Sequence, residues 1–384
     1  MTKQPFDDAL TVIIKPSNAC NIRCRYCYNS KNDYSNSKMT LEQLRMVFER
    51  ITDDYHNLRI IWHGGEPLLL GIDFFRKAVL IQHEIQKKKT VKFINSLQTN
   101  ATLIDEDWCS FFMRNSIKVG VSFDGPPFGK SGRPNWSEAI SGISMLRRNN
   151  IKFGTIAVIN GGNIDYLNEI YDYFLKSRLN VNLNCVFLHG RMTNPLNRSY
   201  AIYPDEYVEK MNSLFNKWLF DSDCYSIVNP YYDTIRTIID APHSCEYTSC
   251  LYKFISIDYK GDVFPCGRFD DKMLCMGNIY SNSVHELFAS DSYNKLVLAA
   301  IDRRNKCRSS CNIYNYCAGG CNFNAHLSGD IRNNSFPECV AYQKMLLHVK
   351  EALDSLDDNN SSIDAINRTV SQMIRKRKES RDSL

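Results

Sequence analysis

Hydrophobic and polar positions follow two different periods along the first half of the chain. Short runs rich in apolar and β-branched residues are typical of buried strands, and six of them occur before residue 190. The runs cover residues 11–14, 59–62, 91–98, 118–123, 153–159 and 181–187. The segments between them repeat apolar residues every three or four positions, as amphipathic helices do. Six strand–helix units in succession predict an α/β fold with a parallel sheet and right-handed crossovers.

Six units are fewer than the eight of a closed barrel, so we expect a partial, TIM-like (β/α)6 barrel. Functional side chains of such folds lie at the carboxyl ends of the strands. Polar residues mark several helix starts: Thr40 with Gln43 fits a capping box, and Asp105 and Ser137 are placed to cap two later helices.

The alternation stops near residue 200, where the domain organisation changes. A helical stretch follows, and a cysteine-rich region with short elements begins near residue 243, with a hairpin turn predicted at 259–262. Helical periodicity returns near residue 340 and continues, after a polar break, into a basic tail. We therefore expect a partial barrel, connecting helices, a cysteine-rich domain and a helical tail, at residues 1–200, 201–242, 243–345 and 346–384 respectively.

Composition narrows the class of protein. Hydrophobic residues make up 43% and charged residues 23% of the 384 positions, which is ordinary for a globular protein and excludes disorder of its main body. The net charge of +5 is too small to imply nucleic-acid binding. No apolar run of about 18 residues and no apolar signal segment is present. We therefore expect a cytoplasmic protein that binds neither nucleic acid nor membrane.

Cysteine is the unusual residue type, with 15 copies. That number is far too low for a disulfide-rich mini-protein, and disulfides are rare without a secretory signal. Clustered cysteines in an intracellular protein more often bind metal. Four cysteines stand outside any cluster and are expected to be ordinary small apolar residues, namely Cys109, Cys185, Cys224 and Cys275.

Three cysteines follow directly after the first predicted strand, at Cys20, Cys24 and Cys27. Thiolates are the ligands that iron–sulfur clusters need, and three of them in one loop can hold three corners of a [4Fe–4S] cubane. The fourth iron is then open to bind a substrate or cofactor. A zinc site completed by a distant ligand is the alternative interpretation.

The spacing of these cysteines, with the aromatic Tyr26 before the last one, resembles the hallmark of the radical S-adenosylmethionine (SAM) superfamily. The resemblance implies that SAM binds the open iron through its amino and carboxylate groups. Reductive cleavage of SAM then yields a 5′-deoxyadenosyl radical, which abstracts hydrogen from an unactivated carbon. The segment Gly64, Gly65, Glu66 and Pro67 follows the second predicted strand and resembles the motif that holds the SAM amino group.

Other residues at strand ends are weaker matches to the SAM contacts of this family. Gln98 ends the third predicted strand, Ser122 ends the fourth, and Asn160 follows the fifth. Ser122 and Arg133 resemble contacts to the SAM carboxylate in related peptide-modifying members, and a guanidinium suits a carboxylate because it can bind both oxygens. A solvated loop charge is an equally good interpretation of Arg133.

A second group of cysteines lies in the C-terminal half, and its spacing resembles the SPASM domain of radical SAM enzymes that modify peptides and proteins. The resemblance implies two auxiliary [4Fe–4S] clusters besides the SAM-binding one. One auxiliary cluster would take Cys245, Cys250, Cys266 and Cys321, and the other Cys307, Cys311, Cys317 and Cys339. The spacing from Cys307 to Cys311 is one residue longer than the common pattern. A pair of structural zinc sites is the alternative.

A radical SAM domain followed by a SPASM domain implies peptide or protein modification, and three functions are open. The first is a maturase of a ribosomally made precursor peptide, which joins an aromatic ring to a side-chain β-carbon in a crosslink called a cyclophane. The second is an anaerobic sulfatase-maturating enzyme, which oxidises Cys or Ser to formylglycine. The third is an iron–sulfur electron carrier without catalytic activity, or an RNA-modifying enzyme.

One position favours the crosslinking function. Sulfatase-maturating enzymes carry an Asp, the proposed base of their oxidation, immediately after the cysteine matched by Cys266, where this chain has Gly267. Glycine cannot accept a proton, and the segment from Cys266 to Phe269 looks more like the cyclophane-forming maturases. Asp270 is our candidate base, with Asp271 beside it. Plain loop solvation is the alternative interpretation of both carboxylates.

The partners follow from the same resemblance. No leader-binding domain fits before the first strand, which starts by residue 11, so the barrel, the SPASM surface or a separate protein must recognise the precursor. An exposed strand edge that pairs with an extended peptide is one physical route. We expect a monomer that receives electrons from a donor such as flavodoxin or ferredoxin.

Overall fold

The computed structural model describes residues 9–27, 37–130, 132–187, 192, 194–221, 226–239, 250–270 and 272–355. The chain divides into two compact units, each built from separate stretches of sequence. Unit 1 comprises Met1–Ser122, Pro134–Phe153 and Cys250–Ile301. Unit 2 comprises Phe123–Arg133, Gly154–Ser249 and Asp302–Leu384.

Unit 1 contains a sheet in the order β10-β9-β8-β1-β2-β3-β4. Strands β1 to β4 run parallel, β8 is also parallel to β1, and β9 and β10 are antiparallel additions. The strands are β1 (Ala9–Lys15), β2 (Asn57–Trp62), β3 (Lys92–Thr99), β4 (Lys118–Ser122), β8 (Phe254–Asp258), β9 (Asp262–Phe264) and β10 (Gly277–Asn278). The helices are α1 (Leu41–Asp54), α2 (Ile72–Gln86), α3 (Glu106–Arg114), α4 (Trp136–Arg148) and α8 (Val284–Phe288), with 3-10 turns η1 (Pro67–Leu70) and η5 (Lys272–Leu274).

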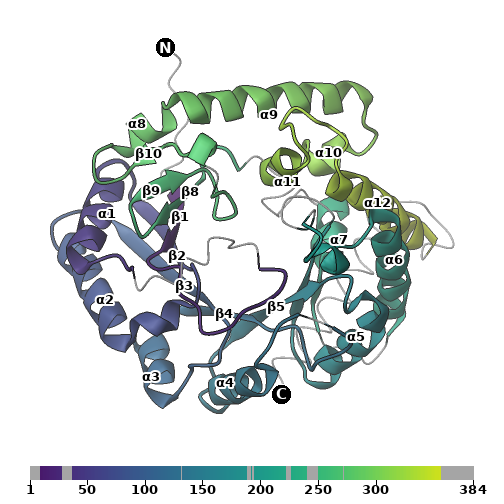
Figure 1. The fold of residues 1–384 in the computed structure, drawn as a ribbon, viewed down its shortest axis with the longest axis horizontal. Helices are drawn as coiled ribbons and strands as arrows, with labels where there is room; N and C mark the ends of the chain where they lie inside the picture. Colours follow the sequence, from purple (N-terminus) through teal and green to yellow (C-terminus); the bar gives the residue numbers. More distant parts are fainter. Residues whose placement is uncertain are drawn as a thin grey trace. The chain divides into compact units, whose positions relative to one another are not determined.

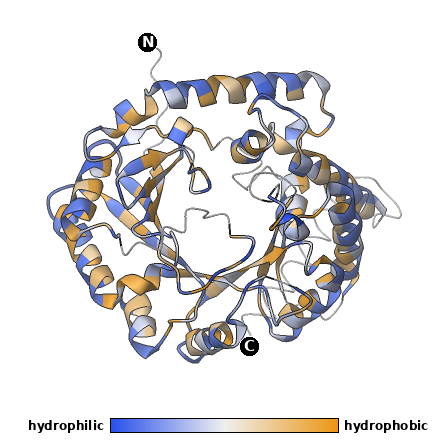
Figure 2. Ribbon diagram, viewed as in Figure 1, coloured by the Kyte–Doolittle hydropathy of each residue, from blue (hydrophilic) through white to orange (hydrophobic). Residues whose placement is uncertain are grey.

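The helices α1, α2 and α3 cover one face of strands β1 to β4 (Figure 1). The burial pattern of β1 explains why helices cover this face. Leu10, Val12 and Ile14 are at most 1% exposed, and alternate side chains of a strand point to the same face. The buried stripe of α1 packs on this face, where the Phe48 ring lies 6.2 Å from that of Trp62 on β2. Figure 2 shows hydrophobic and hydrophilic residues mixed along these helices, as amphipathic helices require.

The predicted strands and helix starts can be compared with the structure directly. All six predicted strands are present, and each is followed by a helix. The capping box of Thr40 and Gln43 is formed, and the Asp105 side chain caps α3. The prediction that Ser137 caps a helix is wrong. Helix α4 begins one residue earlier at Trp136, so Ser137 lies in its first turn, where its hydroxyl donates to Glu138 at 2.8 Å.

Unit 2 contains the parallel strands β5 (Phe153–Ile159, from its second residue), β6 (Val181–Cys185) and β7 (Val228–Asn229). Its helices are α5 (Leu167–Lys176), α6 (Pro204–Phe220), α7 (Tyr231–Ile239), α10 (Tyr314–Cys317), α11 (Asn322–Leu327) and α12 (Pro337–Ser355), with η2 (Ile164–Tyr166) and η4 (Arg198–Tyr200). Helix α9 (Asp291–Ser310) begins in unit 1 and ends in unit 2. Helix α12 packs against α6 and α7.

The α/β class predicted from the sequence is confirmed, since a parallel sheet and its helices are present. The hairpin predicted at 259–262 is also present, as the turn between β8 and β9. The end of the predicted helical tail, from residue 356, lies outside the described residues, and the four predicted domain boundaries stay predictions. No helix among the described residues is both long and apolar enough to cross a membrane.

Candidate active site

The loop after β1 presents the first three cysteines. Cys20, Cys24 and Cys27 are all partly exposed, whereas Tyr26 beside them is only 7% exposed. The side chain of Asn21 fixes this loop to the segment after β3, because it accepts from the Asn100 amide at 2.9 Å and donates to Thr102 at 2.8 Å. The loop therefore holds three thiols at the carboxyl end of the parallel strands.

The Gly64-Gly65 turn after β2 lies directly against the cysteine loop. The Gly65 N–H donates to the Ser17 carbonyl at 3.1 Å, and the next N–H donates to the Ala19 carbonyl at 2.8 Å. A Cβ atom at Gly65 would stand 2.0 Å from the Ala19 oxygen. At Gly64 φ is +114° and a Cβ would stand 2.3 Å from the Ser17 oxygen. Only glycine allows two backbones to approach this closely.

Glu66 continues this turn and is only 2% exposed. Its carboxylate accepts hydrogen bonds from the Thr99 hydroxyl at 2.8 Å, the Asn100 N–H at 2.8 Å and the Leu68 N–H at 3.0 Å. The charge is therefore stabilised at the end of β3, where it ties two strand ends together. Pro67 begins the turn η1 immediately after it. The predicted contact of this segment with the SAM amino group stays a prediction.

Polar residues form a row at the carboxyl ends of β1 to β4, at Lys15, His63, Gln98 and Ser122. The Gln98 amide donates to the Ser122 hydroxyl at 2.8 Å. Gly120 makes room for this amide, because a Cβ there would stand 2.3 Å from the Gln98 oxygen. The sequence analysis identified Gln98 and Ser122 but missed Lys15 and His63. A lysine that closes a buried strand and a histidine before Gly-Gly were the available signals.

The structure indicates that His63 is neutral near pH 7. Burial, and secondarily the positive charge of Lys15, lowers the pKa of His63 to about 4. The ring Nδ1 accepts from the Gly64 N–H at 2.8 Å, so the ring proton is assigned to Nε2. His63 therefore contributes a hydrogen-bonding group without a charge.

Two predicted SAM contacts belong to unit 2 and are engaged in local interactions. Arg133 Nε lies 3.1 Å from the carboxylate of Asp124, and both side chains are almost fully buried, at 11% and 1% exposed. Asn160 is 0% exposed, and its side-chain oxygen accepts from the Gly162 N–H at 2.9 Å. Arg133 is thus a buried ion-pair partner rather than a solvated loop charge. Contact with SAM stays a prediction for both residues.

Unit 2 brings four of the predicted auxiliary-cluster cysteines together. Burial, followed by the electrostatic effects of Cys317, Cys307 and Cys311, raises the pKa of the Cys339 thiol to about 12. The pKa of Cys317 is also raised, mainly by burial. Four thiols crowded in this way cannot all ionise unless a cationic centre compensates them. A cluster that supplies iron to each sulfur is such a centre.

The backbone around Cys317 suits a metal-bound thiolate. Hydrogen bonds from the backbone of Gly319 and Gly320 oppose the rise in the pKa of Cys317, so they favour its anionic form. The three residues from Ala318 to Gly320 all have positive φ, so the chain turns directly after Cys317. Hydrogen bonds to cluster sulfurs are among the features by which proteins tune iron–sulfur centres. The donor set therefore fits the predicted [4Fe–4S] cluster.

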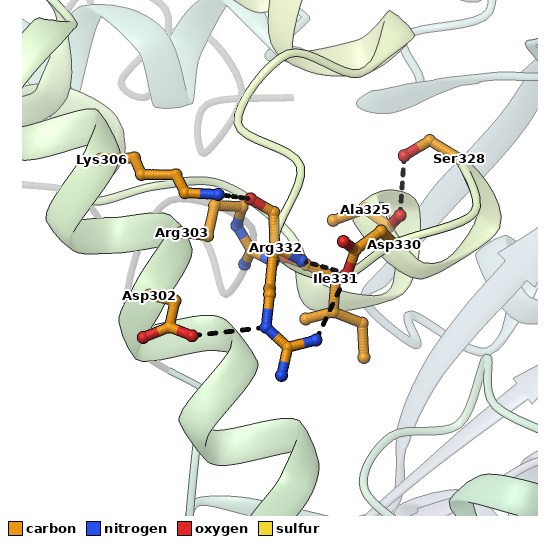
Figure 3. A network of polar contacts seen from close by, with 8 residues as sticks. All are labelled: Asp302, Arg303, Lys306, Ala325, Ser328, Asp330, Ile331 and Arg332. Carbon is orange, nitrogen blue, oxygen red and sulfur yellow. Dashed lines mark hydrogen bonds and ion pairs between the residues drawn. The ribbon is translucent and has the colours of Figure 1, made fainter.

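Arg303 on α9 holds the segment that carries these donors. Its side chain is 0% exposed, and it donates to the carbonyl oxygens of Gly319 at 2.8 Å and Gly320 at 3.2 Å. It also donates to the Ile331 carbonyl and to the side-chain oxygen of Asn322. Figure 3 shows how Arg303 and its neighbours on α9 reach the segment 330–332 that precedes α12. Arg303 therefore connects α9, which carries Cys307, to the segments that follow Cys317 and precede Cys339.

We expect Arg303→Met to remove the iron of one auxiliary cluster, roughly four atoms per chain. The substitution leaves four buried acceptors without their donor, which costs roughly 3 kcal/mol or more of unfolding free energy. Iron and sulfide analysis after anaerobic reconstitution, together with denaturant unfolding, measures both effects. Arg332→Met is the matched control, because the ion pairs of that half-exposed side chain contribute at most about 1 kcal/mol. Full iron content in Arg303→Met would contradict the positioning role.

The other predicted cluster is only partly described. Cys250 and Cys266 lie in unit 1 and Cys321 in unit 2, while Cys245 falls outside the described residues. Among the described residues, no three His, Cys, Asp or Glu side chains are grouped as ligands of a single ion would be. The ligands of a cubane each bind a different iron, so they need not converge on one point. The shared cluster of these four cysteines stays a prediction.

Two family models match this chain, the radical SAM superfamily over residues 14–174 and the iron–sulfur cluster-binding SPASM domain over residues 245–322. The first covers the cysteine loop and the Gly-Gly turn, and the second covers most of the auxiliary cysteines. The chain carries a radical SAM domain and a SPASM domain. It is therefore an enzyme that uses SAM, a SAM-binding [4Fe–4S] cluster and auxiliary clusters.

The similar proteins indicate the kind of substrate of this radical SAM enzyme. A cysteine-type anaerobic sulfatase-maturating enzyme of Clostridium novyi is 28% identical over 341 residues, covering 82% of this chain and 88% of the relative. A solved structure of native anSMEcpe with bound AdoMet and Kp18Cys peptide has a TM-score of 0.78 at 24% identity, covering 92% and 100%. Streptococcus suis SuiB bound to precursor peptide SuiA shares the fold at a TM-score of 0.60 and 16% identity, covering 87% and 76%. The enzyme acts on a peptide or protein.

Proposed function

We propose that this radical SAM enzyme is a peptide maturase that joins an aromatic ring carbon to the β-carbon of a nearby residue in a precursor peptide. The alternative is formylglycine formation, which the sulfatase-maturating relatives favour. One position distinguishes the two functions. Where the sulfatase-maturating enzymes have the Asp, this chain has Gly267, on the loop that follows β9.

The surroundings of Gly267 are tight for a side chain. Gly267 is buried, and a Cβ atom there would stand 2.9 Å from Cδ1 and 3.3 Å from Cγ2 of Ile13. A side chain at this position would therefore require the Ile13 side chain to move. This packing supports glycine at the position, because Ile13 of β1 fills the adjacent space.

Asp270 is the residue we propose as the base of the crosslinking reaction. It is partly exposed, three residues beyond Gly267, on the same loop as Cys266. When bound, SAM would supply the radical that takes the β-hydrogen. The clusters would supply an acceptor for one electron. The ring carbon that has formed the new bond must still lose a proton to recover aromaticity. A carboxylate at Asp270 can accept that proton.

We also propose the substrate, the electron donor and the SAM contacts of this reaction. A ribosomally made precursor peptide is the substrate, and the two peptide-bound structures described above support a peptide in this role. An electron donor such as flavodoxin or ferredoxin supplies the reducing electron, and the enzyme acts as a monomer. The positions Tyr26, Gln98, Ser122, Arg133 and Asn160 are proposed contacts of SAM.

The test uses a short precursor with an aromatic core, taken from an open reading frame beside this gene and deuterated at the β-carbon. We expect deuterium in 5′-deoxyadenosine and an unlabelled product 2 Da lighter than its substrate, because one carbon–carbon bond replaces two bonds to hydrogen. Mass spectrometry measures both. Oxidation of Ser to formylglycine also removes 2 Da, so an aldehyde-reactive hydrazide must be included. Hydrazide labelling of the product, or no transfer of deuterium, would overturn the crosslinking proposal.

A further inference from the structure

The turn that follows β3 holds the side chain of Asn21, the residue directly after Cys20, in a closed ring of hydrogen bonds. The Asn100 amide donates to the Asn21 side-chain oxygen at 2.9 Å, and the Asn21 amide donates to the Thr102 hydroxyl at 2.8 Å. The Thr102 hydroxyl donates in turn to the Asn100 side-chain oxygen at 2.7 Å. Each of the three side chains donates once to the next, and hydrogen bonds connected in this way strengthen one another.

The backbone of this turn is held in an unusual conformation by the core of unit 1. Ala101, between the two ring members, has a φ of +64° and is 0% exposed. A residue with a Cβ adopts a left-handed backbone only at a cost that the surrounding structure must offset. Gly142 of α4 allows the close packing, since a Cβ there would stand 2.0 Å from the Ala101 carbonyl oxygen. The core therefore fixes the turn, and the turn carries both partners of Asn21.

The same turn is bonded to the buried carboxylate of Glu66. The Asn100 N–H donates to one carboxylate oxygen at 2.8 Å, and the Thr99 hydroxyl donates to the other at 2.8 Å. Asn100 is only 6% exposed. Its backbone thus binds the carboxylate that is predicted to meet the SAM amino group, while its side chain binds the loop that carries the cluster thiols.

We propose that Asn21 and Asn100 are positioning residues for SAM, which set the cysteine loop at a fixed distance from the Glu66 carboxylate. By the family resemblance, the open iron and this carboxylate hold the same SAM molecule, so its affinity depends on how the two are placed. The ring holds the residue after Cys20 and no thiol, so it governs the placement of the loop rather than the number of ligands.

This role concerns the binding of SAM, which comes before any change in the peptide. It therefore goes beyond the proposed function, and it holds for a crosslinked product and for formylglycine alike. All measurements that test it are made without peptide, so the identity of the product does not affect them.

The test compares Asn21→Ala, Asn100→Ala and the double variant. Thr102→Val removes the hydroxyl of the ring at nearly unchanged volume, and Thr102→Ser keeps it. Asn115→Ala is the matched control, because the Asn115 amide donates to the Phe111 carbonyl at 2.8 Å at the end of α3. Iron analysis gives the cluster content, equilibrium dialysis gives the Kd for SAM, and EPR of the reduced cluster with and without SAM shows whether SAM reaches the iron.

A second measurement uses the iron-free protein. Hydrogen exchange followed by mass spectrometry should show faster exchange of residues 20–27 in Asn21→Ala than in the wild type, because the loop has lost its bonds to the turn. Exchange in α3 should be unchanged and serves as the internal reference.

We expect Asn21→Ala to keep its full iron content while its Kd for SAM rises roughly tenfold, since two hydrogen bonds are lost. Asn100→Ala should raise the Kd by at least this factor, and the double variant no further than Asn100→Ala, because both changes break one ring. Thr102→Val should also weaken SAM binding, whereas Thr102→Ser and Asn115→Ala should bind SAM as the wild type does.

Wild-type SAM affinity in Asn21→Ala at full iron content would overturn the proposal. Effects that multiply in the double variant would do the same, because independent contacts and not a shared ring would explain them. Loss of iron in both Asn21→Ala and Thr102→Val would also contradict it, since that result assigns the ring to cluster assembly.

Discussion

Replacing Cys20, Cys24 and Cys27 together by Ala should abolish formation of 5′-deoxyadenosine. These three thiols are the only protein ligands expected for the SAM-binding cluster, and without them that cluster cannot assemble. Iron content should fall from roughly twelve to roughly eight atoms per chain, since the auxiliary ligands remain. Anaerobic reconstitution, iron and sulfide analysis, and chromatography of deoxyadenosine after reduction with dithionite measure these changes.

Cys109→Ala provides the matched control for this triple variant. Cys109 is 0% exposed on α3, and burial raises the pKa of its thiol to about 11, so it is an inert core residue. We expect its replacement to leave both iron content and SAM cleavage at wild-type values. If the triple variant still cleaves SAM at the wild-type rate, the assignment of the cysteine loop is wrong.

Gly65→Ala should lower SAM cleavage roughly a hundredfold, although it adds only one methyl group. The new Cβ would stand 2.0 Å from the Ala19 carbonyl oxygen and 2.6 Å from that of Asn18. Both oxygens belong to the backbone, so the backbone must move. Both residues directly precede Cys20, so the displacement reaches the cluster loop. A shift of about 1 Å in a reactive geometry costs about a hundredfold in rate, and overpacking costs about 1–3 kcal/mol of stability.

Gly154→Ala is the matched control for the glycine turn, because nothing lies within 4 Å of a Cβ at that position. We expect this variant to keep wild-type iron content and SAM cleavage. Deoxyadenosine formation, iron content and thermal unfolding should be measured on both variants. Wild-type SAM cleavage by Gly65→Ala would show that the close approach of turn and cysteine loop is not required.

The sequence by itself determined the repeating elements of this protein. Apolar side chains two apart on β1, and three or four apart on α1, have to face a common core, so the local period fixes the element type. The capping box at Thr40 is likewise a local arrangement. The three cysteines of the loop after β1 lie within eight residues, and their spacing alone indicates an iron–sulfur cluster. Each of these features depends only on neighbours in the chain.

The tertiary structure decided which distant segments meet. Strand β8 joins β1 in parallel register, more than two hundred residues away in the sequence, and Gly267 on the loop beyond β9 packs against Ile13 of β1. No local period encodes such a partner, because strand pairing is made by backbone hydrogen bonds that are the same for every residue type. The roles of His63 and Arg303 were hidden for the same reason. Their burial and their hydrogen-bond partners exist only once separate strands and helices have packed together.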